Sequence, residues 1–194
     1  MTLLFAFFLV LYASSGLGSS DPNAVRESLR ENFGGRAPTP SELDELVERM
    51  RPLLARLIAL EVLDLARDQR SLRIVIRSQM LFQSGEDQLN PRYDELFRFL
   101  CSQLQGRPLS VVVEGHTDQA QPMAGTHATN LSLSSARAAV VADRLRFFGL
   151  GGDQLSTAGF GGERPISDNL TAEGRRKNRR IVLRIEPRLD SEHW

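Results

Sequence analysis

Hydrophobic residues along this chain follow two different periods, and each period predicts a different kind of element. Apolar side chains alternate with arginines over residues 71–77, as in a half-buried strand. A similar alternation predicts a strand over 180–186, and turn residues bound two further apolar runs, 109–115 and 155–160. Because residues 111–113 are three consecutive valines, we expect the 109–115 strand to be buried on both faces.

Three other stretches repeat their apolar residues every three or four positions, as helices with one buried face do. One covers residues 41–68, where Pro52 should kink or divide it. The second runs over 91–105, and the third over 134–148 with Ser134 as its N-cap. Helices alternating with strands predict an α+β fold, a two-layer sandwich with a mixed sheet and helices on one face.

The start of the chain differs from the rest, because residues 1–13 are almost wholly apolar and no ionisable side chain occurs before Asp21. A bilayer span needs about 20 apolar residues, and a secretory signal begins with basic ones. Residues 1–13 are too few for a complete bilayer span, and no basic residues precede them as in a secretory signal. We favour a truncated transmembrane helix, with an uncleaved anchor and a cleaved signal peptide as the alternatives.

A short amphipathic helix and a linker are expected next, with Val25, Leu29 and Phe33 forming a narrow apolar stripe. The expected organisation is a membrane-anchor segment (1–20), the amphipathic helix and linker (21–40), a long helix (41–70), a folded domain (71–187) and a tail (188–194).

Composition narrows the classes of function. The 24 basic and 24 acidic residues give a net charge of zero, so no overall basic field attracts nucleic acid. The single cysteine, Cys101, excludes an internal disulfide and a cysteine-based zinc cluster. We expect no cofactor and no nucleic-acid partner.

The candidate chemistry lies between residues 111 and 137. A strand would deliver Asp118 to one edge of the sheet, and an N-cap at Ser134 would place Arg137 in the first helical turn. A cation in the first turn interacts unfavourably with the helix dipole, so Arg137 would not be needed for helix stability. Helix amides and a guanidinium suit a carboxylate or phosphate, while Asp118 suits an ammonium group. The pair therefore suits a zwitterion, although a weak surface ion pair between the two side chains is the alternative.

Enzymatic alternatives have less support. His116, Asp118 and His127 suggest a metal triad, but no glutamate is placed as a helical general base, and we expect no metal site. Ser134 and Ser135 lack a histidine–acid pair at supporting positions. We do not expect an enzyme.

Three blocks of sequence resemble the OmpA-like peptidoglycan-binding domain over residues 72–186. They read E-G-H-T-D at 114–118, N-x-x-L-S-x-x-R-A at 130–138, and G-F-G-G-E-R-P-I-S-D-N-x-T-x-E-G-R-x-x-N-R-R at 159–180. The resemblance implies a β-α-β-α-β-β fold that grips the diaminopimelate residue of the peptidoglycan stem peptide. It places the ammonium on Asp118 and a carboxylate on Arg137. The other residues that it implies in the pocket are Thr117, Asn130, Leu133, Asn178 and Arg179.

Residues 1–15 are similar to the latter part of the single span of MotB-type flagellar stator proteins. This resemblance implies an inner-membrane protein with a periplasmic C-terminal domain, a homodimer beside a MotA-like multi-span subunit, and a plug-like role for residues 21–33. In that family an ion-carrying aspartate lies just upstream of the matching methionine, and residues 1–20 contain none. A plain tether between inner membrane and peptidoglycan, without a channel, is the alternative.

Overall fold

The computed structural model describes residues 40–68, 70–121 and 127–188, with side chains from residue 43 onward. The expected anchor and amphipathic helix, and all but the first residue of the tail, lie outside the described residues. Within the ranges described, no helix is long and apolar enough to cross a membrane.

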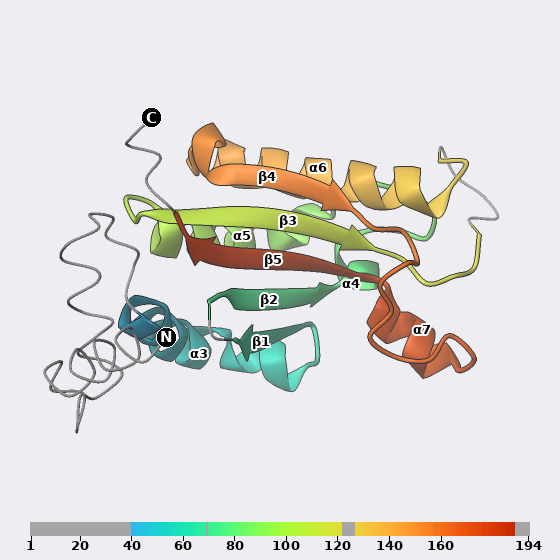
Figure 1. The fold of residues 1–194 in the computed structure, drawn as a ribbon, viewed down its shortest axis with the longest axis horizontal. Coiled ribbons are helices and arrows are strands. Elements are labelled where there is room, and N and C mark those ends of the chain that lie inside the picture. Colours follow the sequence, from blue (N-terminus) through green and yellow to red (C-terminus); the bar gives the residue numbers. More distant parts are fainter. Residues whose placement is uncertain (1–39, 69, 122–126, 189–194) are drawn as a thin grey trace, which may run out of the picture. The chain divides into compact units, whose positions relative to one another are not determined.

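A five-stranded mixed sheet organises the fold, in the order β1-β2-β5-β3-β4 (Figure 1). Its strands are β1 Leu63–Arg67, β2 Leu72–Arg77, β3 Leu109–His116, β4 Leu155–Gly159 and β5 Arg180–Pro187. Strands β3 and β4 are parallel, and the other neighbouring pairs are antiparallel. The predicted α+β class is confirmed.

The helices are α3 Pro40–Ala59, α4 Ser78–Leu81, α5 Asp94–Leu104, α6 Asn130–Phe147 and α7 Ala172–Asn178, with short 3-10 turns η1 Pro91–Tyr93 and η2 Gly152–Gln154. The prediction that the long helix extends from residue 41 to residue 70 was wrong for residues 60–70. The helix ends at Ala59, and a turn through Glu61 (φ 54°) leads into β1, which pairs with β2. Leu63 is buried there because its strand register places it opposite Ile76.

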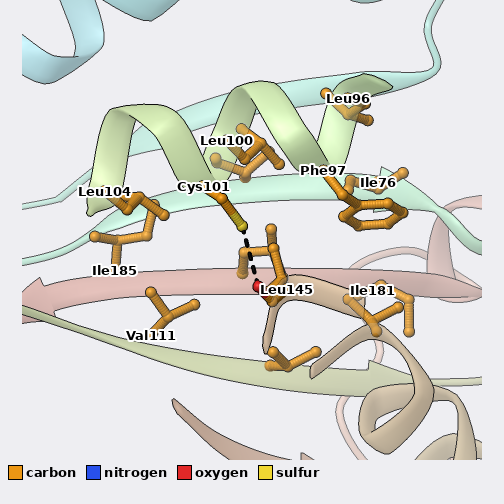
Figure 2. Close-up of a cluster of buried hydrophobic side chains, with 14 of the residues drawn as sticks. Ile76, Leu96, Phe97, Leu100, Cys101, Leu104, Val111, Leu145, Ile181 and Ile185 are labelled. Atoms are coloured by element: carbon orange, nitrogen blue, oxygen red, sulfur yellow. Dashed lines mark hydrogen bonds between the residues drawn. The ribbon is translucent and has the colours of Figure 1, made fainter. Parts of the chain in front are cut away.

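Helices α3, α5 and α6 contribute to one hydrophobic core against the sheet. Figure 2 shows the side chains of α5 facing those of the central strands. Val111 and Val113 point into this core, whereas Val112 is only half-buried, so the expectation of burial on both faces of β3 was wrong. Strict alternation places every second side chain on the opposite face.

Cys101 is buried in this core and packs as part of it. Its Sγ donates a hydrogen bond to the Leu145 carbonyl at 3.3 Å (Figure 2). Burial raises the pKa of the Cys101 thiol to about 11, so the sulfur stays protonated and unreactive at neutral pH.

Candidate binding site

Helix α6 begins four residues earlier than the sequence pattern suggests. Thr129 is its N-cap: the Thr129 side chain accepts a hydrogen bond from the Ser132 amide at 3.1 Å, and the Thr129 amide donates to Ser132 Oγ at 3.3 Å. The Ser134 hydroxyl donates back to the Leu131 carbonyl from inside the helix. The prediction that Ser134 caps the helix was therefore wrong, and Arg137 lies in its third turn, away from the N-terminal amides.

Arg137 instead fastens a loop to α6. Its Nε donates to the Glu86 carbonyl at 2.7 Å, its Nη2 to the Gln83 carbonyl at 2.9 Å and its Nη1 to Ser78 Oγ at 3.2 Å. The guanidinium carbon also lies 5.0 Å from the centre of the Phe82 ring. Three of its five N–H donors are thus used by the described residues, and two are left for another acceptor.

The charge of Arg137 survives this burial. The residue is only 5% exposed, and burial lowers the pKa of its guanidinium to about 10, with the nearby Arg179 adding to the decrease and Asp87 opposing it. A pKa of about 10 still leaves the group protonated at neutral pH. A permanent cation therefore lies at low dielectric, where its interactions are stronger than in water.

Asp118 lies two residues after the end of β3, and its carboxylate pairs with Arg179 and not with Arg137. Arg179 Nη1 donates to Asp118 Oδ2 at 2.5 Å, so the alternative of a surface pair between Asp118 and Arg137 does not describe this structure. The Asp118 residue is 6% exposed, and within the described ranges no protein donor reaches its Oδ1. One carboxylate oxygen is therefore held by a cation while the other has no described partner.

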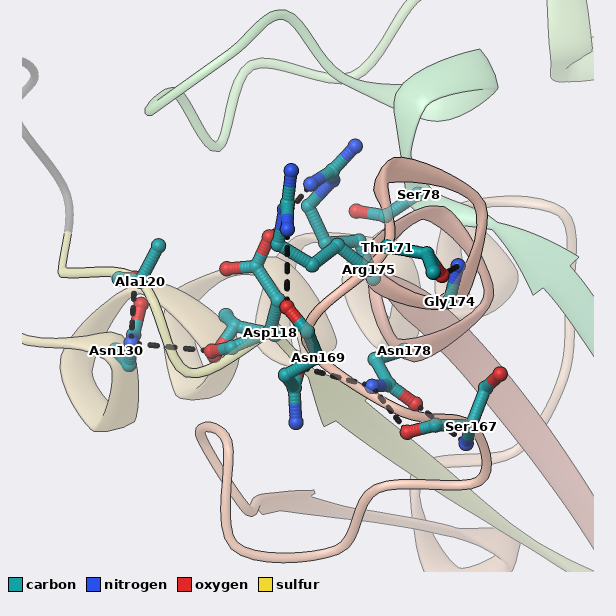
Figure 3. Close-up of polar contacts among 12 residues, drawn as sticks. Ser78, Asp118, Ala120, Asn130, Ser167, Asn169, Thr171, Gly174, Arg175 and Asn178 are labelled. Carbon is teal, nitrogen blue, oxygen red and sulfur yellow. Dashed lines mark hydrogen bonds and ion pairs between the residues drawn. The ribbon is translucent and has the colours of Figure 1, made fainter.

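The backbone around Asp118 is fixed by its neighbours. Asn130 Nδ2 donates to the carbonyls of Asp118 (3.2 Å) and Ala120 (2.8 Å), which ties the loop to the start of α6 (Figure 3). Thr117 Oγ1 donates to the Asp118 carbonyl at 2.8 Å, and the Thr117 amide donates to the Gly161 carbonyl. These contacts use Thr117 and Asn130 to orient Asp118.

An open hollow of about 1380 Å³ brings most of the expected site residues together. Six of the seven line it: Thr117, Asp118, Asn130, Leu133, Arg137 and Arg179. Its charged lining consists of four arginines, Arg92, Arg137, Arg175 and Arg179, against the single aspartate. Among the described residues, this wall therefore has an excess of three positive charges and suits a ligand that carries carboxylates. Arg92 and Arg175 line the hollow although neither was an expected site residue; Arg175 lies within the third block of the resemblance, and no sequence motif marks Arg92.

Asn178 is the seventh expected site residue, and it lies outside this lining. It is fully buried, and its side-chain oxygen accepts a hydrogen bond from the Ile166 amide. Figure 3 shows its contacts with the other two residues: it accepts from the Ser167 amide and donates to Ser167 O and Asn169 Oδ1. All four contacts of its amide are within 3.0 Å. Asn178 thus shapes the loop before α7, and the structure does not bring it to the hollow.

His116 and His127, which were considered as metal ligands together with Asp118, contact different parts of the protein. His116 stacks on Phe160, with 5.1 Å between ring centres, and burial lowers its pKa. His127 Nε2 instead lies 3.1 Å from Asp87 Oδ2. In the part of the chain that the structure describes, no three His, Cys, Asp or Glu side chains gather in a way that could hold a metal ion.

The fold and the hollow together define a small α+β ligand-binding domain. The sequence model of the OmpA family matches residues 81–179, half of the chain, and the chain belongs to the OmpA family.

Similarity to individual proteins extends beyond the matched domain. Over 97% of its length the chain is 26% identical to Motility protein B of Bacillus subtilis, of which it covers 87%. It is 34% identical over 59% of its length to the peptidoglycan-binding protein ArfA of Mycobacterium tuberculosis, but spans only 34% of that protein.

Two solved structures have the same fold. The cell wall anchor of the T6SS from Pseudomonas aeruginosa matches with a TM-score of 0.64 at 28% identity, over 71% of this chain and 96% of that one. A putative MotB-like protein from Desulfovibrio vulgaris matches with a TM-score of 0.69 at 24% identity, over 77% and 94% of the two chains.

Proposed function

We propose that the hollow binds the stem peptide of peptidoglycan through its diaminopimelate residue and so anchors the chain to the cell wall. The observation that carries this proposal is that Asp118 and Arg137, opposite in charge and supplied by separate elements, line one hollow. Similarity to a peptidoglycan-binding protein and to a cell wall anchor supports the same ligand class. The side chain of diaminopimelate ends in an ammonium and a carboxylate, which matches the two charges.

The contacts of the site indicate how this zwitterion would be held. The ammonium would approach Asp118 Oδ1, because Oδ2 is occupied by Arg179. The carboxylate would accept hydrogen bonds from the two Arg137 N–H groups that do not donate to Glu86, Gln83 or Ser78. Arg179, which is about one-third exposed, can supply a second donor to that carboxylate. Both charges are fixed before the ligand arrives, so little ordering is required on binding.

Replacing Asp118 with asparagine tests the proposal. The change removes the counter-charge of the ammonium, and a hydrogen bond to a charged group contributes about 1.5–3 kcal/mol. We expect the full chain to bind purified sacculi about 10- to 150-fold more weakly in a sedimentation titration. Asp153→Asn is the matched control, because Asp153 also pairs with an arginine, Arg188, but does not line the hollow. Unchanged sedimentation of Asp118→Asn would show that the ligand binds elsewhere.

We further propose that the wall-bound chain is a MotB-like subunit of a flagellar stator, anchored in the inner membrane with its C-terminal domain in the periplasm. In this role it would be a homodimer beside a MotA-like multi-span subunit. The similarity to Motility protein B along 97% of the chain supports this role. The alternative is a plain tether between the inner membrane and peptidoglycan, without a channel.

Complementation separates these two roles. If the chain is a stator subunit, expression of its complete gene together with that of its MotA-like partner is expected to restore swimming to a non-motile Bacillus subtilis strain that lacks its own stator genes. The Asp118→Asn variant should restore less swimming, because an unanchored stator cannot resist the torque on the rotor. Absence of swimming, with wild-type sedimentation retained, would favour the tether.

A further inference from the structure

The hollow carries more positive charge than one zwitterion requires. The ammonium and carboxylate of diaminopimelate would match Asp118 and Arg137, and Arg179 is already paired with Asp118. Arg92 and Arg175 also line the hollow, and its described lining contains no second acidic residue to balance them. Two cations are therefore left over after the proposed ligand group has been placed.

Arg175 is held in position by the protein. Its Nη1 donates to the carbonyls of Asn169 and Leu170, each at 2.9 Å, as Figure 3 shows for Asn169. No acceptor among the described residues reaches its Nε or Nη2 group, and the residue lines the hollow. A guanidinium whose position is already fixed loses little conformational entropy when it binds a carboxylate.

The backbone of Arg92 is fixed, and its side chain has no ion-pair partner among the residues that the structure describes. The Asn90 side chain accepts a hydrogen bond from the Arg92 amide at 3.1 Å, which holds the residue at the start of η1. Its side chain is exposed, and no described acidic residue lies within ion-pair distance of it. An exposed cation on a wall that is already positive suits an anion supplied by the ligand.

We infer that the hollow has a second anion position, to which Arg92 and Arg175 contribute, and that it takes another free carboxylate of the stem peptide. The inference rests on the proposed function. The stem offers two carboxylates of this kind: that of the glutamate before diaminopimelate, and the C-terminal one of the alanine after it. Amidation of the carboxylate that occupies this position would remove its charge and weaken binding.

Calorimetry with synthetic stem tetrapeptides tests this inference on the full chain in detergent. Three peptides are compared: one with both carboxylates free, one amidated at glutamate and one amidated at the terminal alanine. We expect one amidation to weaken binding about two- to fivefold, as for a solvent-accessible ion pair, and its position identifies the carboxylate. The preference for the free acid should also decrease as the salt concentration rises.

Variants then assign the position to the two arginines. In Arg92→Gln or Arg175→Gln the preference for the free acid should be at least halved, while Arg98→Gln should keep it. Arg98 is an exposed arginine close by in sequence, on α5, but it does not line the hollow. Equal affinity of wild type for all three peptides, or an undiminished preference in both test variants, would overturn the inference and leave the proposed function standing. If no peptide binds at all, the proposed function fails with it.

Discussion

Replacing Arg137 with alanine is expected to abolish sedimentation with sacculi and also to lower the free energy of unfolding by about 2–4 kcal/mol. The second effect follows from its surroundings, because Gln83 and Glu86 would lose the donor to their carbonyls and Ser78 the donor to its hydroxyl. From sequence alone, the change should leave the fold intact, because Arg137 is assigned to the ligand and not to the core. Its burial and its contacts contradict that expectation.

Ser78→Ala is the control that separates ligand binding from the support of the loop. It removes one acceptor of Arg137 but leaves the guanidinium in the hollow. Urea denaturation and sacculus sedimentation would be measured on both variants. If Ser78→Ala loses stability and binding in the same proportion as Arg137→Ala, then Arg137 acts only by holding the loop and makes no contact with the wall.

The Gly115→Ala variant is expected to lose about 3 kcal/mol of stability and to bind sacculi more weakly. A Cβ at position 115 would lie 2.0 Å from the backbone oxygen of Ser134, where α6 crosses β3. Backbone on both sides cannot rotate away as a side chain can, so the helix must move off the strand. Because β3 leads to Asp118 and α6 carries Arg137, that movement would separate the two charges of the site.

Gly152→Ala serves as the comparison for this variant. A Cβ there would meet only the Arg146 Nε atom, at an ordinary contact distance of 3.6 Å, and Gly152 does not line the hollow. Its urea midpoint and its sedimentation should remain close to those of wild type. Wild-type binding by a destabilised Gly115→Ala would show that the spacing of Asp118 and Arg137 is not critical.

Strands of the sheet could be predicted where their own residues alternate between apolar and polar. Alternation in 71–77 and 180–186 identifies β2 and β5 because each strand has one face in the core. Strand β1 was not predictable in this way. The apolar residues of Leu63–Arg67 have a spacing that would also fit a continuation of the preceding helix. Only the pairing of this segment with β2 makes it an extended strand. The start of α6 was misplaced because both Thr129 and Ser134 are good N-cap residues, and the partner Ser132 decides between them.

The site was predictable as a set of residues but not as a set of contacts. Asp118 and Arg137 could be found because their charges have no evident role in the core. Their partners come from distant parts of the chain: Arg179 is 61 residues from Asp118, and the Glu86 carbonyl is 51 residues from Arg137. A backbone carbonyl has no side-chain signature, so no pattern in the sequence indicates that Arg137 will hold that loop.

The place of β5 in the sheet has a mechanical consequence for an anchor. Arg179 immediately precedes this strand, which lies between β2 and β3 and is paired with both along its length (Figure 1). A force applied to a peptide bound by Arg179 would be transmitted first to β5, the central strand of the sheet. Extracting that strand requires two ladders of hydrogen bonds to break together, so the ligand would be tethered to the part of the fold that yields last under tension.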